Sequence, residues 1–286
     1  IQVKIYRTLP DNIITDPSSC LIPFEKIDFK IKQKWSQTDQ GQQNTGILVG
    51  DLDGDGQAEI IGYAPSLSRI NIYNGTDGTT KAYIDLSGSV GGTGGWHPTM
   101  TAVLVDADRN GLGEIIIANP DKTLVSYEAD LTGGTFKMVK KWPTSGIVTC
   151  ENPTTADNLP QPIVADLNGD GVPELIVYNK IYNAVTGAYL GQTEPIASAN
   201  VGRVPLRVGN RATNFMTTAD FDGDGLPEIV AGGKIYKVAF AADKKSVTCT
   251  KLYENSVIAD GFTAVDDIDM DGKLDCIVTN LPTAGQ

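Results

Sequence analysis

The chain contains a nine-residue acidic stretch, Asp51-Leu-Asp-Gly-Asp-Gly-Gln-Ala-Glu59, that recurs four more times. The other copies are Asp106-Ala-Asp-Arg-Asn-Gly-Leu-Gly-Glu114, Asp166-Leu-Asn-Gly-Asp-Gly-Val-Pro-Glu174, Asp220-Phe-Asp-Gly-Asp-Gly-Leu-Pro-Glu228 and Asp267-Ile-Asp-Met-Asp-Gly-Lys-Leu-Asp275. Successive copies start 47 to 60 residues apart. That period is the length of a four-stranded propeller blade with generous loops, and it is too long for most helical repeats.

Apolar segments flank every copy. A short segment such as 46–49 precedes it, and a β-branched run such as Ile115-Ile-Ile117 follows it. These segments read as two buried strands joined by the acidic stretch. A third strand is expected in most units, at 70–73, 180–182 and 234–236, and a half-exposed fourth strand at 136–142 and 247–253. The pattern predicts an all-β protein, a β-propeller of four-stranded blades, with repeats starting near residues 46, 101, 161, 215 and 262.

The ends of the chain bear on how the ring is completed. Residues 1–6 resemble a third strand and residues 29–35 a fourth, whereas the last unit shows only its first two strands. Residues 1–45 are therefore expected to complete the last blade, so that residues 1–286 form a single propeller domain with no exposed sheet edge. The alternative is that the five blades belong to a larger ring with further blades outside this chain.

Each acidic stretch has the oxygen pattern of a calcium loop. Side-chain oxygens occupy its first, third and fifth positions, glycine the sixth and an acid the ninth. Calcium takes six to eight oxygens at ~2.3 to 2.6 Å, which a tight loop of this pattern can supply. The seventh residues share no chemistry, as expected if only their backbone carbonyl binds. The predicted ligands of up to five Ca²⁺ ions are Asp51, Asp53, Asp55, Gln57, Glu59, Asp106, Asp108, Asn110, Leu112, Glu114, Asp166, Asn168, Asp170, Val172, Glu174, Asp220, Asp222, Asp224, Leu226, Glu228, Asp267, Asp269, Asp271, Lys273 and Asp275.

Charge and loop geometry support the metal over its alternatives. The five stretches hold 18 of the 35 acidic residues, and such clustering is repulsive without a cation. An EF-hand requires an acid at the twelfth position and a helix after the loop, and neither is present. Mg²⁺ fits less well because it demands a strict octahedron and keeps its waters. Solvated acidic turns without metal are the remaining alternative. The sixth-position glycines, Gly56, Gly111, Gly171, Gly225 and Gly272, are expected to adopt φ > 0.

Composition excludes several classes of partner. A net charge of −12 repels nucleic acid and anionic membranes, and no run approaches the ~20 apolar residues of a membrane span. The four cysteines, Cys20, Cys150, Cys249 and Cys276, contain no C-x-x-C pair, so a thiolate zinc site has no support. They form either two disulfides or separate buried thiols.

Together the loops and their flanking strands resemble the FG-GAP or VCBS-type repeats of integrin α-subunit propellers and of many secreted propeller proteins. The resemblance covers roughly residues 46–286. It implies a propeller with calcium in the loop joining the first two strands of each blade, usually on the face opposite the ligand-binding one. The family usually has seven or eight blades, of which five are visible here. The resemblance does not identify a ligand.

Little in the sequence indicates catalysis. The single histidine, His97, lies in the glycine-rich segment Gly94-Gly-Trp-His-Pro98, which reads either as a ligand-contacting loop or as a connection between blades. The first hypothesis is a secreted or cell-surface binding or adhesion module, without catalytic residues, that recognises protein or glycan. The second is an extracellular carbohydrate-active enzyme, a polysaccharide lyase or hydrolase. The third is a structural component of a larger surface assembly.

Overall fold

The computed structural model describes residues 33–37, 46–64, 67–86, 102–118, 123–143, 162–194, 203–206, 211–214, 216–255 and 262–279. The chain divides into two compact units, Ile1–Ser36 and Gln37–Gln286. In the first unit only residues 33–36 are described, and they form no strand. The N-terminal strands expected at 1–6 and 29–35 therefore lie almost entirely outside the described residues, and the expected ring closure stays a prediction.

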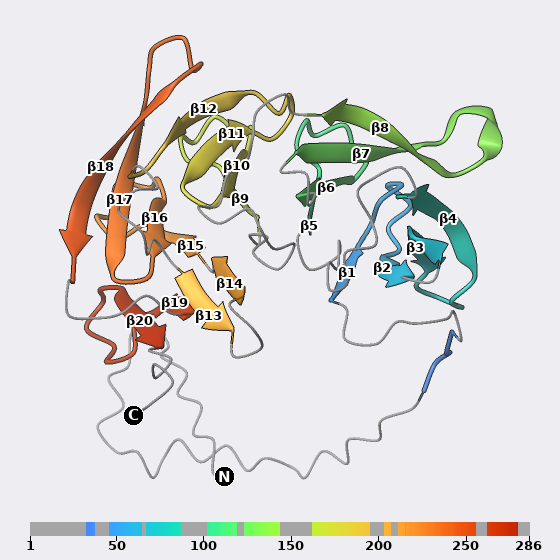
Figure 1. The fold of residues 1–286 in the computed structure, drawn as a ribbon, viewed down its shortest axis with the longest axis horizontal. Helices are drawn as coiled ribbons and strands as arrows, with labels where there is room; N and C mark the ends of the chain where they lie inside the picture. The colour runs from blue at the N-terminus through green and yellow to red at the C-terminus, as the bar shows by residue number, and fades with distance from the viewer. Residues whose placement is uncertain are drawn as a thin grey trace, which may run out of the picture. The chain divides into compact units, whose positions relative to one another are not determined.

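The second unit is all-β and is built from repeated four-stranded antiparallel sheets (Figure 1). Sheet 1 contains β1 (Ile47–Gly50), β2 (Glu59–Ala64), β3 (Arg69–Asn74) and β4 (Thr80–Asp85). Sheet 2 contains β5 (Ala102–Val105), β6 (Glu114–Ala118), β7 (Leu124–Asp130) and β8 (Lys137–Pro143), with a short 3-10 turn, η4 (Thr132–Gly134), in its last hairpin. Sheet 3 contains β9 (Ile163–Ala165), β10 (Glu174–Val177), β11 (Lys180–Asn183) and β12 (Tyr189–Gln192). Sheet 4 contains β15 (Met216–Ala219), β16 (Glu228–Ala231), β17 (Lys234–Phe240) and β18 (Val247–Glu254).

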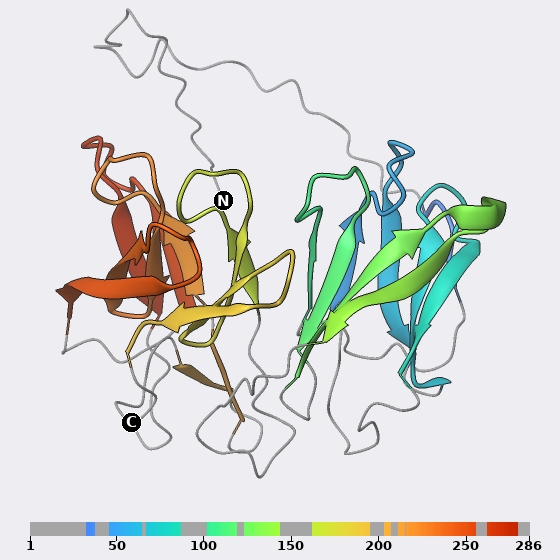
Figure 2. The same cartoon turned by 90° about the horizontal axis from the view of Figure 1, so that it is seen from above.

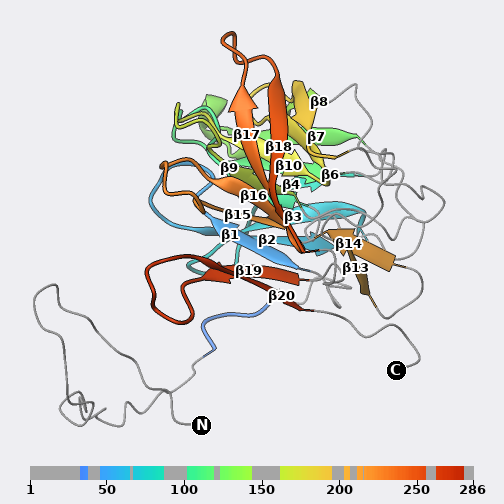
Figure 3. The same ribbon diagram turned by 90° about the vertical axis from the view of Figure 1, so that its left-hand side faces the viewer.

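Two further strand pairs complete the described elements. The hairpin of β13 (Arg203–Leu206) and β14 (Arg211–Asn214) lies between sheets 3 and 4 in the sequence, and the sequence pattern did not predict it. The pair of β19 (Phe262–Asp266) and β20 (Asp275–Thr279) is the fifth repeat, and it has the two strands that the sequence predicts (Figure 3). Each four-stranded sheet is a meander in which sequence neighbours pair, so every connection is a local turn.

The second strands of sheets 2, 3 and 4 are buried on both faces. In β6, Ile115 and Ile117 pack into the cluster shared with sheet 1, whereas Ile116 packs into the cluster shared with sheet 3. In β10, Leu175 faces sheet 2 and Ile176 faces sheet 4 in the same way. Because side chains alternate between the two faces of a strand, a strand held between two neighbouring sheets must be apolar throughout. This explains the continuous β-branched runs after each acidic stretch.

The sheets stack in chain order, face against face. The first strands of successive repeats are neighbours, since β1 contacts β5, β5 contacts β9, β9 contacts β15 and β15 contacts β19. The outer strands β4 and β8 also contact each other, and sheets 1 and 2 stand side by side in Figure 2. The apolar core is therefore a series of seams between consecutive sheets. This arrangement is consistent with a blade-type β fold.

The first strands are less buried than the sequence suggests. In β1, Leu48 packs against the seam between sheets 1 and 2, but Ile47 and Val49 point to the other face and are 59% and 54% exposed. The prediction of a buried first strand is therefore wrong for one face of β1, whereas β5, β9 and β15 are half-buried or buried along their length. Ile47 and Val49 belong to none of the apolar clusters of the described residues, whereas Val103 and Leu104 of β5 pack against two of them. None of the described residues forms a helix that could cross a membrane.

Candidate metal loops

Each acidic stretch forms the turn between the first and second strands of its repeat. We call these turns loop 1 (51–59), loop 2 (106–114), loop 3 (166–174), loop 4 (220–228) and loop 5 (267–275). The ninth residue of each loop is also the first residue of the second strand, and in loop 1 Glu59 pairs in register with Gly50. The loops are thus held at both ends by sheet hydrogen bonds.

The first aspartate closes each loop onto the sixth-position glycine. The glycine N–H donates to Oδ2 of that aspartate in all five loops, at 2.8, 3.0, 2.7, 2.9 and 2.9 Å in chain order. The glycines have φ between 81° and 87°, a region that side chains strongly disfavour. The structure therefore confirms that the sixth position requires glycine. The contact orients the first carboxylate toward the centre of the loop.

Two further contacts recur in every loop. The N–H of the seventh residue donates to Oδ1 of the fifth at 2.7 to 2.9 Å. The N–H of the second residue donates to a carboxylate oxygen of the ninth at 2.7 to 3.0 Å. In loops 1 to 4 the ninth residue is a glutamate no more than 2% exposed. The same three contacts thus fix the first, fifth and ninth side chains of all five loops against the backbone of their own loop.

The fourth position carries a constraint that sequence reasoning missed. It has positive φ in every loop, with values of 72° at Gly54, 59° at Arg109, 70° at Gly169, 75° at Gly223 and 60° at Met270. Glycine adopts this conformation at little cost, whereas Arg109 and Met270 are strained there. Because this position is glycine in three loops but arginine or methionine in the other two, the sequence does not reveal the shared positive φ.

Four of the loops bring three acids close enough to hold a metal ion. In each of them one carboxylate oxygen from each acid lies within 4.8 Å of the others. These acids are Asp51, Asp53 and Glu59; Asp106, Asp108 and Glu114; Asp220, Asp222 and Glu228; and Asp267, Asp269 and Asp271. Loop 3 has Asn168 in place of its third-position acid.

The chemistry of these loops suits a hard cation. The side chain of Asp53 is only 10% exposed, and its Oδ1 has no hydrogen-bond partner among the described residues. A buried carboxylate oxygen without a partner is costly, and a cation coordinated by it would remove that cost. The residues therefore fit a metal ion, although the identity of the ion is a separate question.

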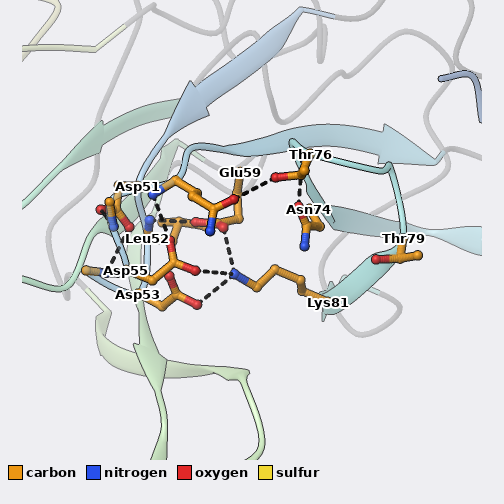
Figure 4. Close-up of polar contacts among 12 residues, drawn as sticks. Asp51, Leu52, Asp53, Asp55, Glu59, Asn74, Thr76, Thr79 and Lys81 are labelled. Atoms are coloured by element: carbon orange, nitrogen blue, oxygen red, sulfur yellow. Dashed lines mark hydrogen bonds and ion pairs between the residues drawn. The ribbon is translucent and has the colours of Figure 1, made fainter. Parts of the chain in front are cut away.

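A lysine from an outer strand reaches into loop 1 (Figure 4). Lys81 Nζ, from β4, lies 2.7 Å from Asp53 Oδ2, 2.7 Å from Glu59 Oε1 and 3.7 Å from Asp55 Oδ2. Its side chain is 18% exposed. The sequence interval from the ninth-position acid to such a lysine differs between repeats, so the repeat pattern gave no signal for it.

Loop 2 has the same arrangement, and in loop 4 a lysine of the third strand takes a similar place. Lys141, from β8, lies 2.7 Å from Asp108, 2.7 Å from Glu114 and 2.6 Å from Glu128 of β7. Lys237, from β17, contacts Asp222, lies 2.6 Å from Asp224 and lies 3.9 Å from Glu228. Loops 3 and 5 differ. Lys244 reaches only Asp170 of loop 3, and its side chain is 59% exposed, while Lys273 lies 4.0 Å from Asp271 of its own loop and is 85% exposed.

The pKa shifts follow from burial and from these contacts. Burial raises the pKa of Glu174 to about 7, and it raises the pKa of Glu114 and of Glu228 as well. Burial alone would lower the pKa of Lys81, but hydrogen bonds to Asp53 and Glu59 raise it well above its ordinary value. Glu114, Glu174 and Glu228 are thus harder to ionise than a solvated glutamate, because burial disfavours their charged form.

The remaining predicted residues have different outcomes. Gln57 accepts a 2.7 Å hydrogen bond from the Thr76 hydroxyl through its side chain, which fits a role for its backbone rather than its amide. Coordination through the seventh-position carbonyls stays a prediction. Cys249 and Cys276 are free thiols, so the thiol alternative holds for these two. His97, Cys20 and Cys150 lie outside the described residues.

Comparison with known proteins yields structural neighbours and no sequence family. No protein-family model matches the chain, and no curated protein matches it. Among solved structures, the rhamnogalacturonan lyase YesW superposes with a TM-score of 0.52 at 17% identity, over 84% of this chain and 44% of that one. A rhamnogalacturonan lyase of Bacillus licheniformis gives a TM-score of 0.47 at 16% identity, over 82% and 44% of the two chains. The biofilm matrix protein Bap1 of V. cholerae gives a TM-score of 0.32 at 18% identity, over 82% and 47%.

The similarity to YesW concerns the fold. At 17% identity, the likeness to YesW shows a shared all-β architecture and no shared activity. The chain spans less than half the length of each of these three structures. What the comparison establishes is therefore an all-β protein of repeated four-stranded sheets whose fold also occurs within a longer carbohydrate-active protein.

Proposed function

We propose that this chain is a calcium-binding β-propeller module that acts outside the cell and binds protein or glycan ligands without catalysing a reaction. The observation that carries the calcium part is the recurrence, in all five loops, of the same three hydrogen bonds from backbone N–H groups to side-chain oxygens. A solvated acidic turn needs no such repetition. Oxygen-only ligands in a flexible loop favour Ca²⁺ over Mg²⁺.

In this proposal the ion has a structural role. The first, third, fifth and ninth side chains and the seventh carbonyl hold it, and it supplies the positive charge that these carboxylates lack. Because each loop links the first two strands of a sheet, the binding free energy adds to the stability of that sheet. At a tenfold excess of calcium over its dissociation constant, each filled loop would add about 1.4 kcal/mol.

Calorimetric titration of chelator-treated protein with calcium tests the proposal. The expected result is binding of up to five ions, with dissociation constants of ~10⁻⁴ to 10⁻³ M as in other extracellular modules, and a higher melting temperature. Asp51→Asn should lose one site, whereas Asp243→Asn, in the β17–β18 hairpin, should retain all sites. No heat of binding and an unchanged melting temperature in millimolar calcium would contradict the proposal.

The ligand classes follow from the structural neighbours. The structural neighbours include a protein that acts on rhamnogalacturonan and a biofilm matrix protein, which makes glycans and surface proteins the ligand classes to screen first. The screen should be run with calcium and again with chelator. If a protein or glycan binds only in the presence of calcium, the result supports a module whose ligand-binding face depends on the metal-bound sheets. A chain that instead assembles with copies of itself or with other surface proteins would be the structural component that the sequence also allows.

A carbohydrate-active enzyme is the second candidate, because the fold is shared with a rhamnogalacturonan lyase. Lyase activity on rhamnogalacturonan leaves an unsaturated product that absorbs ultraviolet light, so a continuous assay is available. If turnover occurs and His97→Ala abolishes it while the melting temperature is unchanged, the enzyme hypothesis replaces the binding module.

A further inference from the structure

The lysines of loops 1, 2 and 4 contact the same oxygens that the proposed calcium ion needs. Lys81 is bonded to the third- and ninth-position acids of loop 1, and Lys141 to those of loop 2. Lys237 contacts the third- and fifth-position acids of loop 4 and lies 3.9 Å from the ninth. Each ammonium therefore contacts the very carboxylates that are predicted to bind calcium.

These three lysines reach their loops from different elements. Lys81 and Lys141 belong to the fourth strands of sheets 1 and 2, and Lys237 belongs to the third strand of sheet 4. Lys81 and Lys141 occupy equivalent positions, at the register shift of the fourth strand against the third, so their likeness can follow from the repeat itself. The convergence of Lys237, from another strand, on equivalent acids cannot. It is expected if the acids require a positive partner in each of these sheets.

An ammonium and a calcium ion are alternative partners for these acids. A lysine donates at most three hydrogen bonds and neutralises one charge, whereas Ca²⁺ takes six to eight oxygens and neutralises two. Calcium binding in loop 1 thus requires Asp53 Oδ2 and Glu59 Oε1 to exchange the lysine for the ion. The Oδ1 of Asp53, which lacks a partner among the described residues, is free to take part at once.

We propose that Lys81, Lys141 and Lys237 are tethered counter-cations that compete with calcium for loops 1, 2 and 4. Each lysine stabilises its loop when calcium is scarce and lowers the calcium affinity of that loop. Sheets 1, 2 and 4 are then held together in a calcium-poor compartment, and their loops fill only where calcium is abundant. This inference rests on the proposed calcium binding and adds the chain's own residues that regulate it.

Lys81→Met gives the direct test, since methionine keeps the length of the side chain and removes its charge. We expect the melting temperature in chelator to fall and the calcium affinity of one site to rise roughly two- to fivefold, the range of a partly exposed ion pair. Calorimetric titration and native mass spectrometry at graded calcium concentrations measure the affinity and the number of ions bound. The triple variant, which adds Lys141→Met and Lys237→Met, should raise the calcium affinity of three sites.

Lys81→Met should lower stability in chelator but raise calcium affinity. These opposite effects distinguish competition with calcium from a purely structural role of the lysine. If the lysine only supported the fold, replacing it would lower both the stability and the calcium affinity. Lys137→Met is the matched control, because Lys137 also lies on an outer strand but pairs with Asp130 outside the loops, and it should leave calcium affinity unchanged. If Lys81→Met fails to fold in chelator, it can be refolded in calcium, and Lys81→Gln can be measured alongside it.

The failures are distinguishable. A flat calcium titration of the wild-type protein overturns the proposed calcium binding and this inference with it. Wild-type binding together with equal or weaker binding by both Lys81→Met and Lys81→Gln overturns only the inference.

Discussion

The backbone N–H of Gly113 in loop 2 donates a 3.0 Å hydrogen bond to the carbonyl oxygen of Leu52 in loop 1. Neighbouring loops are therefore in direct contact. The same holds further along the chain, where the guanidinium of Arg109 in loop 2 lies against Gly171 of loop 3, and Leu226 of loop 4 lies against Gly169 of loop 3. A change in one loop should consequently be felt in the next.

Gly54→Ala tests this contact between loops. Gly54 has φ +72°, and an added Cβ would lie 2.6 Å from the Gly111 carbonyl oxygen of loop 2. Gly223 of loop 4 has φ +75° but open space around it, so Gly223→Ala measures the backbone strain alone. We expect Gly223→Ala to cost about 1 kcal/mol and Gly54→Ala to cost at least about 1 kcal/mol more. Urea denaturation in chelator measures both, and equal losses would show that the loops do not constrain each other.

Replacing the two asparagines of the loops should have different effects. Asn168→Asp gives loop 3 a further carboxylate, and we expect its calcium affinity to rise because binding depends on the number of charged ligands. Asn110→Asp also adds a carboxylate, but Asn110 Nδ2 donates a 2.8 Å hydrogen bond to Glu128 Oε1, which a carboxylate would repel. The second variant should therefore melt at a lower temperature in chelator. Calorimetry and melting curves of both variants check this, and identical behaviour would contradict it.

Met270 is strained, and glycine should relieve the strain. Met270 has φ 60°, and its side chain is largely exposed, so Met270→Gly removes the strain and little packing. We expect loop 5 to gain about 0.5 kcal/mol, net of the greater flexibility of glycine in the unfolded chain. Lys273→Gly, at an exposed position without positive φ, is the control and should lose stability. A loss in Met270→Gly as large as that of the control would exclude strain at this position.

Stability at acidic pH should depend on Glu194. This residue follows β12 and accepts hydrogen bonds from Lys234 at 2.8 Å and Lys251 at 2.7 Å, both in sheet 4. Burial would raise the pKa of Glu194, but the hydrogen bonds from the two lysines outweigh burial and hold its pKa at about 2. The unfolded-state pKa is about 4.3.

Since the pKa of Glu194 is lower in the folded state, its contribution is fully present above about pH 4.3 and is lost as the pH falls toward 2. Glu194→Gln should lower the free energy of unfolding at neutral pH by on the order of 2 kcal/mol and should flatten its decline in that acidic range. Asp243→Asn, in the β17–β18 hairpin, should keep the wild-type decline. Parallel pH profiles for Glu194→Gln and the wild type would rule out this role.

The sequence predicted the parts of the fold that repeat. The loops and the strands beside them follow from the spacing of Asp51, Gly56 and Glu59 and their equivalents, because local turn geometry and strand periodicity are written in neighbouring residues. The positive φ at Met270 was not predicted, since methionine rarely adopts it. Nor were the lysines predicted, because Lys81 contacts Glu59 across the intervening strand of the sheet, and the sequence interval between such a lysine and its acid differs between repeats.

The second residue of loops 1 to 3 lies in the seam between its own sheet and the next, with Leu52, Ala107 and Leu167 each 0 to 1% exposed. Each of these loops is therefore anchored in the seam beside it, and a force on the loop also acts on the seam. A force that pulls the chain ends apart would load these turns one after another, so rupture would proceed sheet by sheet in separate steps. An ion bound in a loop would then strengthen the apolar seam beside that loop against the force.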